Sequence, residues 1–203
     1  MEKPFRLPGV HVYEYLLVID IPAALRERIE AERNILAAGY SVTQPQAGRP
    51  NVSLARFSAM KMAEERIIQK LQMIAVDEKP FMIELQDYGG YPMHAIFIRI
   101  ANQQRVLQLI KNLKQARRLM RSGGEDPYFL QDPTIPLAAR LQKEKYTEAM
   151  KEYQHKKFSG RFMADSFLLI KRLKEEKKYT VVKRFEFACL PVSNGQGSLF
   201  SQG

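Results

Sequence analysis

Cysteine and long apolar runs are scarce in this chain of 203 residues. The single cysteine, Cys189, can form neither an internal disulfide nor a Cys-x-x-Cys metal site, which indicates a reducing compartment. No apolar stretch approaches the roughly 20 residues of a transmembrane helix, and the apolar run over 15–21 contains Asp20. The first residues also lack the apolar core of a signal peptide. We therefore expect a cytoplasmic protein that does not enter a membrane.

Histidine is scarce as well, and the common catalytic and metal motifs are missing. The chain has neither a His-Glu-x-x-His sequence nor a P-loop. Its three histidines, His11, His94 and His155, are too scattered to support a Ser–His–Asp arrangement. Each has a simple structural role open to it, in a terminal arm, in a strand or at the end of a helix. We expect no metal and no cofactor.

Positive charge is abundant. The chain has 32 Lys and Arg against 22 Asp and Glu, for a formal net charge of +10 and a pI near 9.7. This balance favours a polyanionic partner, with RNA or a nucleotide as the first expectation. A basic protein without a specific partner is the alternative. The apolar share of 45% is typical of a globular protein with a real core, and a monomer is expected.

Hydrophobic periodicity predicts alternating strands and helices. Strands are expected over 13–21, 51–57, 81–85, 93–100 and 158–170, with 179–187 as the hairpin partner of the last one. Helices are expected over 25–36, 63–74, 106–120 and 143–155, the first with Leu25, Ile29, Glu32 and Leu36 at helical spacing. The sequence DYGGYP, residues 87–92, is expected to form a turn. Residues 1–190 are expected to form one domain, and 191–203 a flexible polar tail.

Two segments of the chain repeat one another. RPNVSLARF, residues 49–57, precedes a helix and a strand that begins about 30 residues after Asn51. DPTIPLAARL, residues 132–141, precedes a helix and a strand about 28 residues after Thr134. The alignment pairs Asn51 with Thr134, Ser53 with Pro136, Leu54 with Leu137, and Arg56 with Ala139 or Arg140. Two copies of strand–helix–strand predict an α+β domain with two pseudo-symmetric lobes.

Alternation along the first repeat predicts which side chains share a face. Two sets are expected on opposite faces of the strand: Asn51, Ser53 and Ala55 on one, and Val52, Leu54 and Arg56 on the other.

The two repeats resemble the paired motifs of the two-histidine (2H) phosphoesterases, the superfamily of LigT-like 2′-5′ RNA ligases and cyclic phosphodiesterases. Each family motif is His-x-Thr/Ser, commonly after a proline, and PNVSL and PTIPL stand at the two motif positions. The segments EERIIQKLQMIA, FMIELQDYGGYPMHAIFIRI and HKKFSGRFMADSFLLIKR extend the resemblance over roughly residues 11–188. The resemblance implies two lobes, each a mainly antiparallel sheet with outer helices, around a central cleft.

The motif residues depart from the family pattern. The resemblance maps the two histidines, general base and general acid in the family, to Asn51 and Thr134. It maps the phosphate-holding hydroxyls to Ser53 and Pro136, of which only Ser53 keeps a hydroxyl. An amide does not titrate and a threonine hydroxyl is a poor acid, whereas imidazole exchanges protons near neutral pH. No catalytic residue can therefore be named with the family's chemistry.

Further residues are candidates for binding rather than catalysis. Asn51, Ser53 and Thr134 could still contact a phosphate, and three arginines near the motifs could assist: Arg49, Arg56 and Arg140. Three tyrosines are candidates for stacking on bases: Tyr88, Tyr91 and Tyr128. The basic helix over 111–121 could follow a nucleic-acid backbone. Solvated surface charges and rings that close the ends of loops are the alternative explanations.

Three functions stay open. The first is a non-catalytic protein that binds RNA or nucleotide phosphates. The second is a phosphodiesterase acting on 2′,3′-cyclic or 2′-5′ phosphodiesters with altered catalytic residues. The third is a structural or protein-interaction module whose charge is incidental.

Overall fold

The computed structural model describes residues 11–40, 48–92 and 94–188. The described residues form two antiparallel sheets. Sheet A has the strand order β5 (Tyr128–Phe129), β2 (Asn51–Met60), β1 (Val12–Asp20), β8 (Ser166–Leu173) and β9 (Thr180–Glu186). Sheet B has the order β6 (Thr134–Ala139), β4 (Ala95–Ile100), β3 (Phe81–Tyr91) and β7 (Ser159–Ala164).

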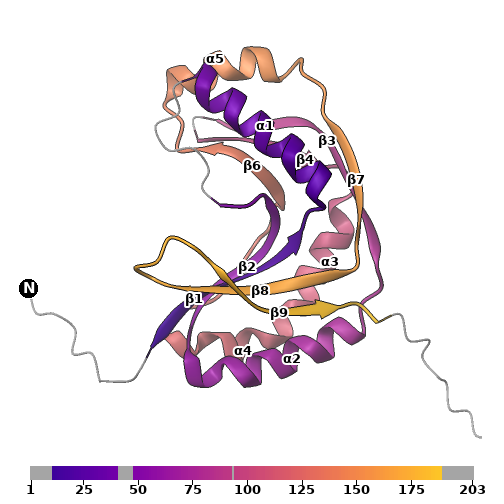
Figure 1. The fold of residues 1–203 in the computed structure, drawn as a ribbon, viewed down its shortest axis with the longest axis vertical. Helices are drawn as coiled ribbons and strands as arrows, with labels where there is room; N and C mark the ends of the chain where they lie inside the picture. Colours follow the sequence, from indigo (N-terminus) through magenta and orange to yellow (C-terminus); the bar gives the residue numbers. More distant parts are fainter. Residues whose placement is uncertain (1–10, 41–47, 93, 189–203) are drawn as a thin grey trace, which may run out of the picture.

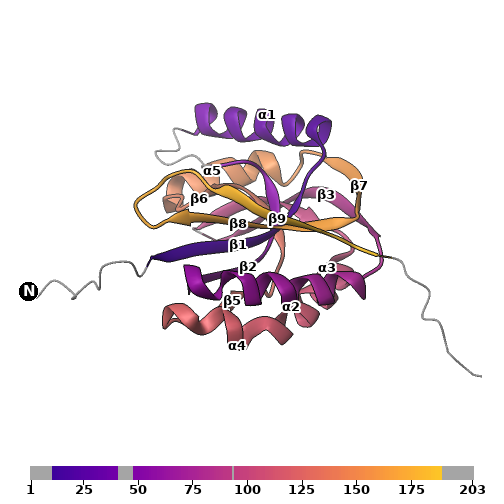
Figure 2. The ribbon, with the colours of Figure 1, turned by 60° about the horizontal axis from the view of Figure 1, so that its bottom comes forward.

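Helices cover one face of each sheet. In Figure 1, α1 (Ala23–Gly39) and α5 (Lys143–Tyr153) lie at the top against sheet B, and α2 (Glu64–Val76) and α4 (Arg117–Met120) lie at the bottom beneath sheet A. The helix α3 (Gln103–Leu113) also packs on sheet A, and short 3₁₀ turns complete the helices: η1 (Lys61–Ala63), η2 (Lys114–Ala116) and η3 (Arg121–Gly123). Figure 2 shows the sheets between the two sets of helices. The α+β fold with two lobes, predicted from the sequence, is confirmed.

The predicted long strand over 158–170 is wrong. It is two strands, β7 and β8, which belong to different sheets and meet at Asp165. The Asp165 carbonyl accepts a hydrogen bond from the Phe187 amide at 2.8 Å, and its carboxylate accepts one from the Ser166 hydroxyl. Apolar alternation continues through this point because both strands have a buried face. The periodicity therefore did not reveal that the chain passes from one lobe to the other.

Three further predictions need correction. The predicted helix over 106–120 is interrupted by η2, which separates α3 from α4. The predicted turn over 87–92 is mostly strand, since β3 continues to Tyr91 past an irregularity at Asp87, where φ is +54°. On α1, Arg33 takes the buried position that was assigned to Glu32, because a spacing of four residues from Ile29 reaches Arg33.

No helix among the described residues is long and apolar enough to cross a membrane. The predicted flexible tail over 191–203 and the lone Cys189 lie outside the described residues.

Candidate functional site

The two motif strands share one irregularity at matched positions. Leu54 in β2 has no register partner on the neighbouring strand β1, and Leu137 in β6 has none on β4. Both strands therefore have a bulge directly after the second motif residue. The bulges confirm the alignment of the repeats and pair Arg56 with Ala139 rather than with Arg140. The pseudo-symmetry of the two lobes extends to single residues.

The bulge also decides which residues share a face. Leu54 and Ala55 are both buried, so alternation shifts by one residue and Arg56 lies on the exposed side with Asn51 and Ser53. The prediction that Ala55 lies with Asn51 and that Arg56 lies opposite is wrong for this reason. The strands β2 and β6 contact one another. We call their uncovered faces the motif surface: Asn51, Ser53, Arg56, Thr134, Pro136 and Ala139.

The polar pair of the first motif is joined by hydrogen bonds. The Ser53 hydroxyl donates to Asn51 Oδ1 at 3.0 Å, and Asn51 Nδ2 donates to the Arg49 carbonyl at 3.0 Å. A carbonyl can only accept, so the amide nitrogen must face Arg49 and the amide oxygen must face Ser53. The proton of Ser53 is therefore engaged. The second N–H of Asn51 is the donor that this pair can still offer to a phosphate.

The three predicted arginines differ in their ion pairs and their exposure. The Arg49 guanidinium lies 3.5 Å from Asp20, which also receives Arg26 at 3.4 Å. Arg140 follows β6 with φ at +58° and is exposed. Arg56 is exposed and makes no ion pair with the residues that the structure describes. Arg56 therefore adds a charge to the motif surface that no described carboxylate offsets.

A second polar cluster lies beside Thr134. The Tyr91 hydroxyl donates a hydrogen bond to Asp132, and Gln103 Nε2 donates to the other Asp132 oxygen at 2.8 Å. Burial and the bond to Asp132 raise the pKa of Tyr91 to about 12. A side-chain hydrogen bond with Thr134 opposes this rise, so the phenol lies next to Thr134. Tyr128 is also close enough to affect the pKa of Tyr91. The start of β6 is thus held by side chains from sheet B and α3.

Two of the three predicted stacking tyrosines are accessible. Tyr91 is 38% exposed and Tyr128 is 57% exposed. Tyr128 is the register partner of Arg56. Tyr88 is only 3% exposed, and its ring meets Tyr153 edge-on at 4.9 Å between centroids. Tyr88 is therefore a core residue with no free face for a base, and its assignment to the site is wrong.

Arg33 is a residue of this region that the sequence analysis missed. It is 8% exposed, and its Nε and Nη2 atoms both donate to the Pro136 carbonyl, at 3.0 and 2.9 Å. Its Nη1 atom donates to the Gly48 carbonyl at 2.8 Å. Burial lowers the pKa of Arg33 from its ordinary value. One side chain of α1 thus joins the second motif to the segment that enters the first.

The Pro136 carbonyl is available to Arg33 because β6 is an edge strand of sheet B. A proline is tolerated in an edge strand, where one side of the strand has no ladder partner. The signal for Arg33 was present in the sequence, since Leu25, Ile29, Arg33 and Leu36 follow helical spacing. The sequence analysis placed the neighbouring Glu32 at this position of the helix instead.

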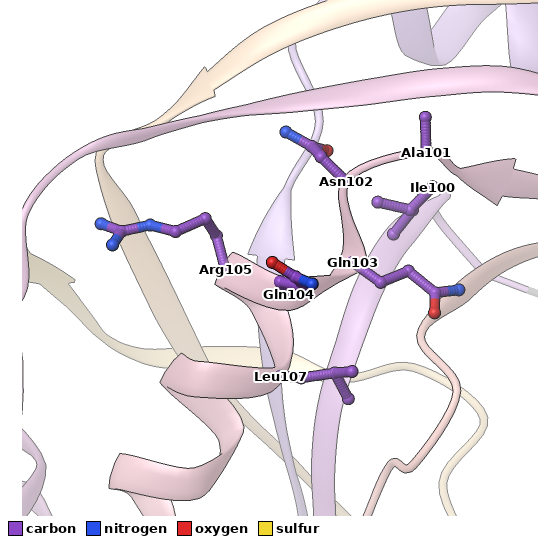
Figure 3. Close-up of a pocket in the computed structure, with 7 residues that line it drawn as sticks. All are labelled: Ile100, Ala101, Asn102, Gln103, Gln104, Arg105 and Leu107. Carbon is purple, nitrogen blue, oxygen red and sulfur yellow. The ribbon is translucent and has the colours of Figure 1, made fainter.

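A pocket of about 500 Å³ lies at the corner between β4 and α3, outside the motif surface. It is lined by Ile100, Ala101, Asn102, Gln103, Gln104, Arg105 and Leu107. Figure 3 shows Gln103 and Arg105 projecting to opposite sides. Asn102 hydrogen bonds to the backbone of Met82 and Glu84, so its polar atoms are used within the fold. The pocket does not bring charged groups together around one point.

The three histidines lie elsewhere. His11 precedes β1, His94 precedes β4 and His155 follows α5, and all three are exposed. None belongs to the motif surface. Within the described part of the chain, no group of three or more His, Cys, Asp or Glu side chains could hold a metal ion.

Several solved structures have a fold similar to that of this chain. E. coli LigT complexed with 3′-AMP is 19% identical over 87% of this chain and 98% of its own, with a TM-score of 0.61. The chain has a LigT-like fold. E. coli LigT complexed with ATP matches with a TM-score of 0.63 at 19% identity, over 88% of this chain and 99% of its own. The protein TT0787 of Thermus thermophilus matches with a TM-score of 0.63 at 17% identity, over 86% and 98% of the two chains.

Neither protein-family models nor curated proteins match the sequence. The likeness to LigT at these identities concerns the fold alone.

Proposed function

We propose that the motif surface binds the phosphate of a nucleotide or of RNA and does not turn it over. One observation carries the proposal: the matched motif positions hold Asn51 and Thr134, and neither side chain exchanges protons near neutral pH. The amide of Asn51 is also hydrogen-bonded to its own strand. The pseudo-symmetric frame is kept, while both proton-transferring groups of the 2H pattern are absent.

Charge and aromatic rings support a binding role. Arg56 supplies an unpaired cation that could bind a phosphate through two N–H groups. Tyr91 and Tyr128 come from different sheets and expose ring surface, so a base could stack on either one. LigT, which has the same fold, has been crystallised with 3′-AMP, with ATP and with phosphate. The proposed ligand therefore places its phosphate at Arg56 and its base at the tyrosines.

Replacing Arg56 tests the binding proposal. We expect Arg56→Gln to weaken binding of 3′-AMP about tenfold or more, because a charge-assisted hydrogen bond to phosphate is lost. Isothermal titration calorimetry measures the change. Arg161→Gln, an exposed arginine on β7, is the matched control and should bind like the wild type. Ser53→Ala should change affinity about twofold or less, because the Ser53 proton is already donated to Asn51. Equal affinities for all four proteins would contradict the assignment of Arg56.

A direct assay of 2′,3′-cyclic nucleotide hydrolysis and of 2′-5′ RNA ligation tests the absence of turnover. We expect no rate above the buffer blank. Turnover comparable to that of LigT, abolished by Asn51→Ala or Thr134→Ala, would refute the proposal. That result would favour the second candidate, a phosphodiesterase with altered residues. Asp20 opposite Asn51, and the Tyr91–Asp132 pair beside Thr134, are the titratable groups it would use.

For oligomeric state, localisation and domain organisation, we propose a monomer in the cytoplasm with residues 1–190 as one bilobal domain. RNA binding that weakens with salt would support it. A protein that binds neither RNA nor a nucleotide at low salt would instead fit the structural or protein-interaction module.

A further inference from the structure

A second basic surface lies on the outer side of sheet A, under β2. Residues 103–123 contain six Lys and Arg and no Asp or Glu. They form α3, η2, α4 and η3, and of these α3, α4 and η3 pack against β2. In Figure 2 α4 lies at the bottom, and sheet A separates it from sheet B, to which β6 belongs. The motif surface is the opposite, uncovered face of β2, so the two surfaces are separate.

Four cations on these helices make no ion pair with a described residue: Arg105, which lies over the Phe81 ring, and Lys111, Lys114 and Arg118. Arg117 and Arg121 both pair with Asp126, at 3.3 and 2.7 Å. Lys111, Lys114 and Arg118 are exposed and make no ion pair with any residue in the described part of the chain. We call these three side chains the outer basic row. Its charge is therefore offset only by solvent and salt.

Without a bound anion, the spacing of the outer basic row destabilises the protein. Lys111 and Lys114 are three residues apart, and Lys114 and Arg118 are four apart. Lys111 lies on α3, Lys114 on η2 and Arg118 on α4, and like charges three or four residues apart on consecutive helical turns repel one another. No acidic residue interrupts the row. A polyanion bound on this surface would attract each cation of the row and so offset the repulsion among them.

The chemistry of the surface selects the class of polyanion. The apolar side of α3, with Val106, Leu109, Ile110 and Leu113, is buried. None of the large exposed apolar side chains of the described residues lies between 103 and 121. A helix that binds a lipid surface inserts apolar side chains, and this one has none to insert. Three glutamines lie among the cations and could contact phosphates and sugars: Gln104, Gln108 and Gln115.

We propose that the outer basic row binds the phosphate backbone of nucleic acid without sequence preference. Its three cations span about 10 Å of helix, along which a nucleic-acid duplex presents about six phosphates. No aromatic side chain lies between 103 and 121, so there is no base stacking on this surface. This site does not depend on the proposed function of the motif surface.

The test replaces the whole row. The triple variant Lys111→Gln, Lys114→Gln, Arg118→Gln is titrated with a single-stranded RNA oligonucleotide by fluorescence anisotropy over a series of salt concentrations. We expect affinity at low salt to fall about tenfold or more, and the slope of log K against log salt to shrink by about two. The matched control is Lys143→Gln, Lys145→Gln, Lys151→Gln on α5, which removes the same charge from the other lobe. It should keep the wild-type slope.

Two results would overturn the inference. One is an equal loss in both triple variants, which would mean that only net charge matters. The other is tighter binding of the wild type to phosphatidylserine vesicles than to RNA, which would indicate a lipid surface. Unfolding is excluded if the triple variant melts at or above the wild-type temperature, as removal of the repulsion predicts. The triple variant should keep the wild-type affinity for 3′-AMP. In Arg56→Gln the slope for RNA should shrink by at most about one, less than in the triple variant, because only one cation is removed. Failure at either surface is therefore recognised separately.

Discussion

Introducing imidazoles at both motif positions, by Asn51→His and Thr134→His with Pro136→Thr, is expected to give the chain measurable 2′,3′-cyclic phosphodiesterase activity. A positioned general acid or base typically contributes about 10²–10⁴-fold. Two such groups should therefore raise the rate by at least about 10⁴-fold over the wild type. Initial rates of 2′,3′-cyclic AMP hydrolysis measure this change.

The local geometry favours the reversion at the first motif. The Arg49 carbonyl accepts from Asn51 Nδ2 at 3.0 Å. An imidazole at this position could donate its Nδ1–H to the same carbonyl, which would fix the tautomer and leave Nε2 free as a base. At the second motif, Pro136→Thr returns a hydroxyl to the exposed side of β6. Both introduced histidines precede the bulges and take positions that are on the half-exposed side of their strands.

Controls separate this effect from general imidazole catalysis. Gln142→His with Gln154→His adds two histidines at exposed positions at the ends of α5 and should stay at the wild-type rate. Each single reversion should give much less than the double, because the two groups act together. A folded triple variant that binds 3′-AMP and shows no turnover would mean that the site has lost more than its proton-transferring groups.

The sequence predicted the lobes and the two motif strands because each depends on local patterns. Proline, a polar residue and an alternating apolar run occur twice, and the bulges at Leu54 and Leu137 confirm the alignment residue by residue. The face of Arg56 was predicted wrongly because one extra residue in a strand reverses the alternation. The alternation of apolar and polar residues does not reveal such an extra residue, because a bulge depends on pairing with a strand that is distant in the sequence.

Other errors had a similar origin. Tyr88 was expected in a turn, but β3 continues through it and burial takes its ring into the core. Arg33 was not singled out in the sequence, where a charged residue is rarely expected to be buried. Its burial depends on two carbonyls, those of Gly48 and Pro136, that come from parts of the chain 15 and 103 residues away. Acceptors at that separation are brought together only by the fold.

Arg33→Met is expected to cost about 2–4 kcal/mol of stability, because two backbone carbonyls lose their donors. Urea unfolding followed by circular dichroism measures the loss. The stability of Arg33→Lys should fall between those of Arg33→Met and the wild type, since an ammonium cannot reproduce the two N–H groups that converge on the Pro136 carbonyl oxygen while a third donates to Gly48. Arg28→Met is the matched control on the same helix. Arg28 also donates to a backbone carbonyl, that of Ser159, but it is exposed, so its loss should be much smaller.

The same variant tests whether Arg33 positions the motif surface. With the link from α1 to β6 removed, the folded Arg33→Met protein should bind 3′-AMP more weakly than Arg28→Met does at a temperature where both are fully native. The competing effect is desolvation, since a buried charge that is exchanged for an apolar side chain of similar size can leave stability unchanged. If Arg33→Met proves as stable as the wild type and binds equally well, desolvation offsets the three hydrogen bonds. The contact of Arg33 with the Gly48 and Pro136 carbonyls would then not be what positions the two motif strands relative to each other.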